Sequence, residues 1–100
     1  MNPVVDLSIP ATHPSLRGHF PANPVVPGVV ILDLLAENIL MLWPGYRISA
    51  IIQVKFLAPL SPETRFQLSW SAMPNGQIDF HCDAKGQRLV QGRLQLTKAP

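Results

Sequence analysis

The pattern of apolar and polar positions predicts one helix, preceded by a short strand and a long loop. Residues 29–43 are apolar on nearly every helical face and are followed by Pro44, so we predict a buried helix there. Pro27 suits the first turn of this helix, because its missing N–H needs no partner at that position. Residues 3–9 are typical of a short strand, whereas the prolines of residues 11–27 exclude regular structure and stiffen the loop.

The second half of the chain is typical of strands joined by turns. Apolar and polar residues alternate with period two, and turn signals stand at residues 59–62, 74–76 and 85–86. We therefore predict a meander of four antiparallel strands, over residues 46–57, 65–70, 77–83 and 88–97. One helix with a single antiparallel sheet of about five strands is an α+β fold, and 100 residues make one domain, spanning residues 1–100.

Composition indicates that part of the surface is hidden. Charged residues make up 14% of the chain, whereas a soluble domain usually carries roughly 25%. A membrane does not explain the deficit, because Asp33 and Glu37 interrupt the longest apolar stretch. The first ten residues do not resemble a signal peptide. We therefore expect a cytoplasmic protein whose helix is covered partly by its own sheet and partly by a second subunit.

Charge and cysteine content exclude several function classes. The net charge is +2 and the basic residues are dispersed, which gives no support for nucleic-acid binding. The single cysteine, Cys82, fits a reducing compartment. His81 precedes it in a predicted strand, so the two side chains should point to opposite faces and form no metal site. Without a phosphate-binding or dinucleotide motif, we expect no metal and no organic cofactor.

Two carboxylates are the main chemical anomaly of the predicted helix. Asp33 and Glu37 are four residues apart and therefore share one helical face. Among apolar neighbours a carboxylate loses hydration, and desolvation favours its protonated form, which is a ready general acid. The alternative interpretation is a solvated polar stripe along the edge of the helix.

The loop and the start of the helix supply two further candidates. His19 lies in the stiff loop, and histidine is the usual proton-transfer residue near neutral pH. The first N–H groups of the helix have no intrahelical partner, and Gly28 has no side chain to keep a carbonyl oxygen away from them. Such donors can polarise a thioester carbonyl. The alternatives are an incidental loop histidine and a Pro-Gly pair that merely begins the helix.

The stretch GHFPANPVVPGV, residues 18–29, resembles the active-site motif of the β-hydroxyacyl-acyl-carrier-protein dehydratases of the FabA/FabZ group. That motif reads GHFPxxPxxPGVxxxE or D, and Asp33 stands at its acidic position, 14 residues after His19. Val54-Lys55-Phe56, followed by the Ser61-Pro62 turn, is similar to the second block of the family. The resemblance covers roughly residues 13–70 and implies the hotdog fold, in which a sheet wraps around a central helix.

The resemblance also implies a role for each motif residue. His19 is the expected base that removes a C2 proton from a 3-hydroxyacyl thioester, and Asp33 the expected acid for the departing hydroxyl. The amides of Gly28 and Val29 are expected to hold the thioester oxygen. The family often has a cis peptide after this histidine. The remaining substrate-binding candidates from the motif are Phe20 and Pro21.

The same resemblance implies the partners. Its members place the site at a dimer interface, so we expect a homodimer that pairs His19 of one protomer with Asp33 of the other. The substrate is expected to arrive on an acidic acyl carrier protein and to enter an apolar tunnel beside the helix. Scattered cations could dock that carrier weakly; the candidates are Arg17, Lys55 and Arg65.

Departures from the family pattern leave alternatives open. The acid is Asp, as in the dehydratase-isomerase branch, whereas plain dehydratases usually have Glu. Glu37 stands where the family commonly has Gln and is a possible modulator, because its titration would couple to that of Asp33. In its small size the chain most resembles the small dehydratases of aryl-polyene pathways. The alternatives are a hotdog acyl thioesterase, or a non-catalytic acyl-binding subunit in a mixed dimer with a related dehydratase.

Overall fold

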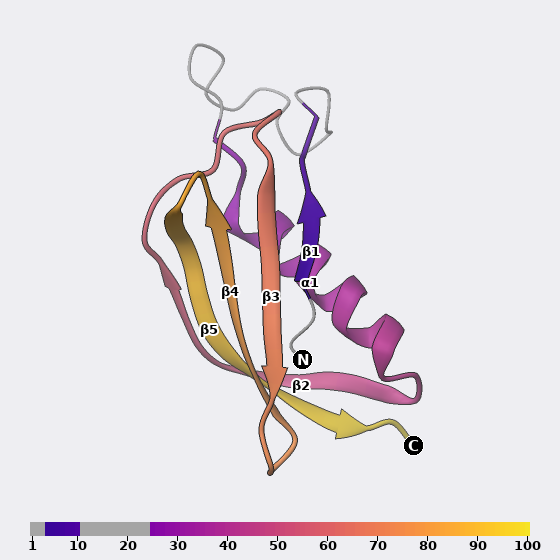
Figure 1. Cartoon of the computed structure of the whole chain (residues 1–100). Coiled ribbons are helices and arrows are strands. Elements are labelled where there is room, and N and C mark those ends of the chain that lie inside the picture. Colours follow the sequence, from indigo (N-terminus) through magenta and orange to yellow (C-terminus); the bar gives the residue numbers. More distant parts are fainter. Residues whose placement is uncertain (1–3, 11–24) are drawn as a thin grey trace.

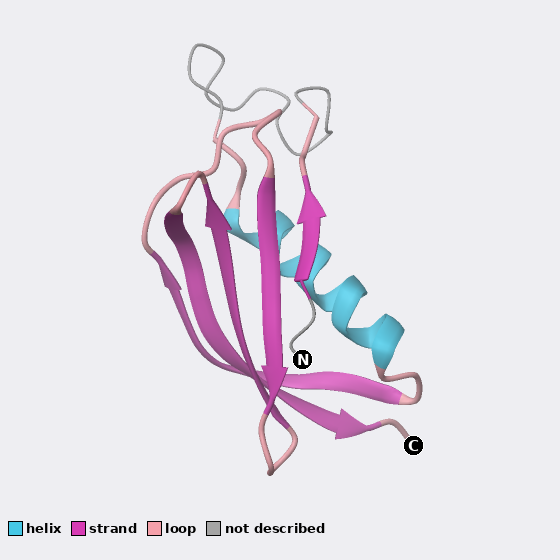
Figure 2. Ribbon diagram, in the orientation of Figure 1, coloured by secondary structure: helices cyan, strands magenta, loops and turns pink. Residues whose placement is uncertain are grey.

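The computed structural model describes residues 4–10 and 25–100, which form one helix and five strands (Figure 1). All five strands belong to one antiparallel sheet, and α1 lies across one face of that sheet (Figure 2). The α+β prediction is confirmed. The elements are β1 (Val4–Leu7), α1 (Gly28–Leu42), β2 (Tyr46–Phe56), β3 (Phe66–Ala72), β4 (Gln77–Ala84) and β5 (Gln87–Lys98).

The strand order, β1-β3-β4-β5-β2, corrects the predicted four-stranded meander. Only β3, β4 and β5 follow one another as neighbours, because short turns join them. In the turn between β4 and β5, Lys85 and Gly86 both have positive φ, +52° and +76°, as the tight hairpin turn requires. Residues 57–65 instead carry the chain from β2 across to β3, so that β2 pairs with β5 and β1 pairs with β3.

The core lies between α1 and the sheet. The helix contributes one buried face, formed by Val30, Ile31, Leu35 and Ile39. The sheet contributes its alternate, inward-facing positions, among which Phe66, Leu68, Ile78, Cys82 and Val90 are almost inaccessible to solvent. This alternation is the period-two pattern of the sequence, so the predicted strands of the second half are confirmed.

The sheet covers α1 on one side only. Val29, Met41 and Leu42 expose 61%, 79% and 54% of their surface, although residues 29–43 are apolar on nearly every face. The sheet therefore covers one part of the helix, as expected, and the expected cover of the remaining part by a second subunit stays a prediction. No helix in the described part of the chain is long and apolar enough to cross a membrane.

Strand β2 forms an edge of the sheet and is unusually apolar for an exposed strand. Its register with β5 shifts between Ile48 and Ala50 and again between Ile51 and Gln53, which marks two bulges. Ile51 pairs with the inward-facing Leu94 and therefore faces the helix side, yet it is 55% exposed. The open side of α1 and the edge strand β2 together hold most of the exposed apolar side chains: Val29, Met41, Leu42, Tyr46, Ile51, Ile52, Phe56 and Leu57.

Candidate active site

The two helical carboxylates lie on the open face of α1. Asp33 and Glu37 are both exposed. Val29, four residues before Asp33, and Met41, four residues after Glu37, are exposed as well. The prediction that they share one face is confirmed. Within one chain this face is a solvated stripe, so the expected loss of hydration requires a second surface to cover it.

The start of α1 presents two free backbone donors. Pro27 is the N-cap residue, with φ −59° and ψ 140°, and no side chain caps this end of the helix. Val30 N donates to the Pro27 carbonyl oxygen at 3.0 Å, whereas the amides of Gly28 and Val29 have no hydrogen-bond partner among the described residues. Two N–H groups are therefore available to an oxygen atom, and the helix dipole adds positive potential at the same point.

An aromatic ring packs against Gly28 on the side where other residues carry a side chain. We expected a carbonyl oxygen to approach the helix start through this space. A Cβ atom added to Gly28 would lie 2.6 Å from Cζ of Phe56 and 3.1 Å from its Cδ1 atom. The missing side chain thus admits the ring of Phe56. A carbonyl oxygen that approaches Gly28 from this side must first displace the ring.

An apolar cavity of about 360 Å³ adjoins the same helix end. It lies between the first turn of α1, the end of β2 and the segment that follows β2. The sequence interpretation assigned no role to Phe56, although this residue ends the Val54-Lys55-Phe56 block and lines the cavity. The lining residues are Val25, Val26, Gly28, Ile31, Phe56, Leu57, Ala58, Pro59, Leu60 and Val90.

The loop motif residues His19, Phe20 and Pro21, and the peptide bond after His19, lie outside the described residues, and their roles stay predictions. The described residues on either side of that loop are nevertheless fixed at one end of the molecule. Val26 N donates to Leu60 O at 2.8 Å, and Glu63 N donates to Ile9 O at 2.8 Å. Ile9 and Val26 are also buried.

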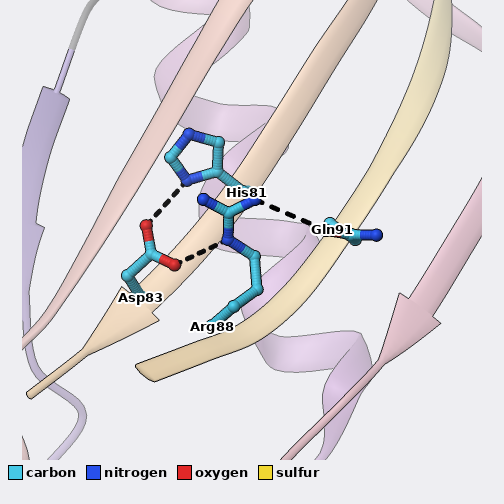
Figure 3. A network of polar contacts seen from close by, with 4 residues as sticks. All are labelled: His81, Asp83, Arg88 and Gln91. Carbon is cyan, nitrogen blue, oxygen red and sulfur yellow. Dashed lines mark hydrogen bonds and ion pairs between the residues drawn. The ribbon is translucent and has the colours of Figure 1, made fainter. Parts of the chain in front are cut away.

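The outer face of the sheet carries a separate polar network (Figure 3). His81 and Cys82 point to opposite faces, as predicted: Cys82 is buried, whereas the His81 Nδ1 atom lies 2.8 Å from Oδ2 of Asp83. Arg88 Nε donates to Oδ1 of Asp83 at 2.8 Å, and Arg88 Nη1 donates to Gln91 at 3.4 Å. This network lies across the sheet from α1 and is not part of the candidate site.

One thiol and one carboxyl group of β4 have shifted pKa values, for different reasons. Burial raises the pKa of Cys82 to about 12, and the neighbouring charge of Asp83 adds to the effect. Partial burial also acts to raise the pKa of Asp83, but hydrogen bonds from Arg88 and His81 outweigh it and leave that pKa below its ordinary value. The described residues contain no cluster of three or more His, Cys, Asp and Glu side chains that could hold a metal ion.

Two of the three predicted docking cations lie among the described residues, and they do not line the same depression. Arg65 lies with Lys85 and Arg88 around an open depression that also contains Asp6 and Asp83. Lys55 is exposed on β2, in register with Gln91 of β5, and does not line this depression. Arg17 lies outside the described residues.

Comparison with known proteins identifies the class of this fold. A chain of the ApeI:P dehydratase heterocomplex from Xenorhabdus doucetiae superimposes with a TM-score of 0.89 at 30% identity, over 97% of this chain and 88% of that chain. The (R)-hydratase from A. caviae superimposes with a TM-score of 0.76 at 14% identity, over 100% and 95% of the two chains, a likeness of fold alone. The helix against one antiparallel sheet is thus the hotdog fold of the FabZ-type dehydratases.

The family assignment is more specific. The ApeI-like family model, described as ApeI dehydratase, matches residues 2–93, and the chain belongs to this family. The 3-hydroxyacyl-[acyl-carrier-protein] dehydratase FabZ of Klebsiella pneumoniae is 27% identical over 99 residues, which cover 87% of this chain. The matched region spans 63% of that relative's length.

Proposed function

We propose that the chain is a 3-hydroxyacyl-acyl-carrier-protein dehydratase. The observation that carries this proposal is the placement of Asp33 on the open face of α1, one helical turn beyond Val29, in a chain of the ApeI-like dehydratase family. Residues four apart on a helix lie about 6 Å from each other. A carboxyl acid and the free amides of the helix start can therefore reach different atoms of one bound thioester.

The proposed reaction divides the work among three groups. His19 takes the C2 proton of the 3-hydroxyacyl thioester, while the amides of Gly28 and Val29 stabilise the negative charge that develops on the thioester oxygen. The electron pair of the C2–H bond forms the C2–C3 double bond as the C3–O bond breaks. Asp33 gives its proton to the departing hydroxyl, which leaves as water. The product is the trans-2-enoyl thioester, still attached to the carrier protein.

The proposed assembly is a homodimer that covers the open face of α1. Within one chain Asp33 is exposed, whereas a general acid near neutral pH gains from desolvation. The exposed apolar residues of α1 and β2 surround it, and an apolar edge strand with unpaired backbone groups favours association. We place His19 of one protomer beside Asp33 of the other, so that each dimer carries two shared sites.

A mixed dimer is the second candidate assembly. It is favoured by the likeness to a chain of the ApeI:P dehydratase heterocomplex. In such a dimer this chain would supply either the acid and amides or the histidine to a site completed by a related subunit. Native mass spectrometry of the chain alone, and after co-expression with neighbouring dehydratase genes, distinguishes the two assemblies.

Substitution of the proposed acid and base tests the reaction. General acid–base groups contribute about 10²–10⁴-fold to a rate, so His19→Ala and Asp33→Asn should each lower the dehydration rate by at least about 10²-fold. Asp6→Asn, which neutralises an exposed carboxylate on β1, is the matched control and should keep full activity. Full activity in His19→Ala or Asp33→Asn would refute the assigned roles. Release of free thiol would instead identify an acyl thioesterase.

A further inference from the structure

The ring of Phe56 lies between the start of α1 and the apolar cavity, which are two parts of the proposed site. One side of the ring packs on Gly28, where the structure leaves no room for a Cβ atom. The same side chain lines the apolar cavity beside the helix start. Phe56 is nevertheless 56% exposed, so the ring meets solvent as well as the cavity and the helix.

The backbone beneath this ring is firmly held. Phe56 is in register with Val90 of β5, and the next two amides, of Leu57 and Ala58, both donate to Leu89 O, at 2.7 and 3.3 Å. A half-exposed side chain on a fixed backbone can move only by rotating about its own side-chain bonds. The ring can therefore swing without any rearrangement of the sheet.

The cavity separates into a buried interior and an exposed rim. Val26, Ile31, Leu60 and Val90 form the interior and are each at most 3% exposed. Phe56 and Leu57 are large apolar residues of the rim, with 56% and 53% of their surface exposed. The ring of Phe56 also packs against the start of the helix, because its atoms are the nearest ones to a Cβ atom built on Gly28.

We infer that Phe56 is a specificity-determining gate of the acyl site. This inference rests on the proposed dehydration, which brings a thioester oxygen to the amides of Gly28 and Val29. An acyl chain that runs from an oxygen bound there into the adjacent cavity passes between Gly28 and the Phe56 ring, so the ring has to turn away from Gly28. The displaced ring then lies along the chain, and its size limits which acyl groups fit.

Binding and turnover of a chain-length series test this gate. The probes are 3-hydroxyacyl pantetheine thioesters with short, medium and long chains, and the readouts are Kd by calorimetry and kcat/KM by loss of water. Phe56→Ala should shift the preference toward long chains by about tenfold or more, because contacts in an apolar pocket discriminate on that scale. Phe56→Leu, which keeps an apolar side chain, should give a smaller shift. Leu57→Ala, at the same rim, should shift the preference less than Phe56→Ala. Val4→Ala, at an exposed apolar position on β1 outside the cavity, is the matched control and should leave the preference unchanged.

The outcomes separate the gate from the reaction. If the unmodified protein dehydrates these thioesters but Phe56→Ala and Phe56→Leu keep its chain-length profile, the gate is refuted and the reaction stands. If the protein binds without turnover and the two variants shift the Kd series, the gate stands and the reaction is refuted. Equal shifts in Leu57→Ala would reduce Phe56 to one of several rim residues and overturn the inference, and so would absence of binding to every probe.

Discussion

At the scale of single residues, Gly28 and Phe56 form a pair whose members are 28 positions apart in the sequence. Nothing in the motif that contains Gly28 points to this partner, because the contact arises only when the end of β2 packs beside the start of α1. The spacing of Asp33 and Glu37, in contrast, is local to one helix and was correctly predicted. Residue-scale predictions were therefore reliable where helical geometry decides, and incomplete where packing decides.

A double-mutant cycle measures the interaction free energy between Gly28 and Phe56. In the unmodified chain, Gly28→Ala places a methyl group where the Phe56 ring lies. In a Phe56→Ala background the same methyl group meets no ring, and alanine is a better helix former than glycine by up to about 1 kcal/mol. The change that Gly28→Ala causes in the free energy of unfolding should therefore be more destabilising in the unmodified chain than in the Phe56→Ala background. The difference should be at least about 0.5 kcal/mol. Equal effects in both backgrounds, measured by urea unfolding, would contradict the contact.

At the scale of elements, the sequence predicted the strands well and their order poorly. Alternation of apolar and polar residues marks each strand locally, and the turn at Lys85-Gly86 fixes which strands form a hairpin. The turn signal at residues 59–62 indicated neighbouring strands, but residues 57–65 carry the chain across the sheet, so the position of β2 beside β5 could not be inferred from adjacent turns. The one-sided cover of α1 by the sheet agrees with the prediction that a second subunit covers the remaining face, and that second part stays a prediction.

The network on β4 and β5 predicts a pH dependence of stability. In the folded chain the pKa of Asp83 lies below its ordinary value. The pairing of Asp83 with Arg88 and His81 therefore stabilises the fold fully at pH values above the pKa that this carboxyl has in the unfolded chain. This contribution should be lost as the pH falls through the lowered folded-state pKa. Asp83→Asn should therefore lower Tm at neutral pH and have a much smaller effect in strong acid. A pH-independent effect of Asp83→Asn on Tm would contradict the electrostatic origin.

At the scale of the whole molecule, the low charge content and the uncovered helix face have a common explanation. The chain places apolar side chains on the open side of α1 and along β2, and it carries few charges that could solvate such a surface. A second subunit on this surface would bury the apolar residues and desolvate Asp33 at once. Assembly and catalytic competence are then linked in the proposed function.

Charges introduced on β2 test this link. Ile51→Lys together with Ile52→Lys places two ammonium groups in the exposed apolar surface and should convert the proposed dimer to a monomer, with loss of the proposed dehydration. Val4→Lys, at an equally exposed apolar position on β1, is the matched control and should leave the dimer intact. Sedimentation velocity provides the readout. A dimer that survives the β2 substitutions would place the interface elsewhere.

The central claim is the loss of water from a 3-hydroxyacyl thioester, and intact-mass analysis of a loaded acyl carrier protein tests it most directly. After incubation with the purified chain, the acyl carrier should become lighter by the mass of one water molecule, with the thioester intact. The Asp33→Asn variant should leave the mass unchanged over the same time. An unchanged mass with the unmodified chain, alone and with a co-expressed partner, would contradict the account, and so would loss of the entire acyl group.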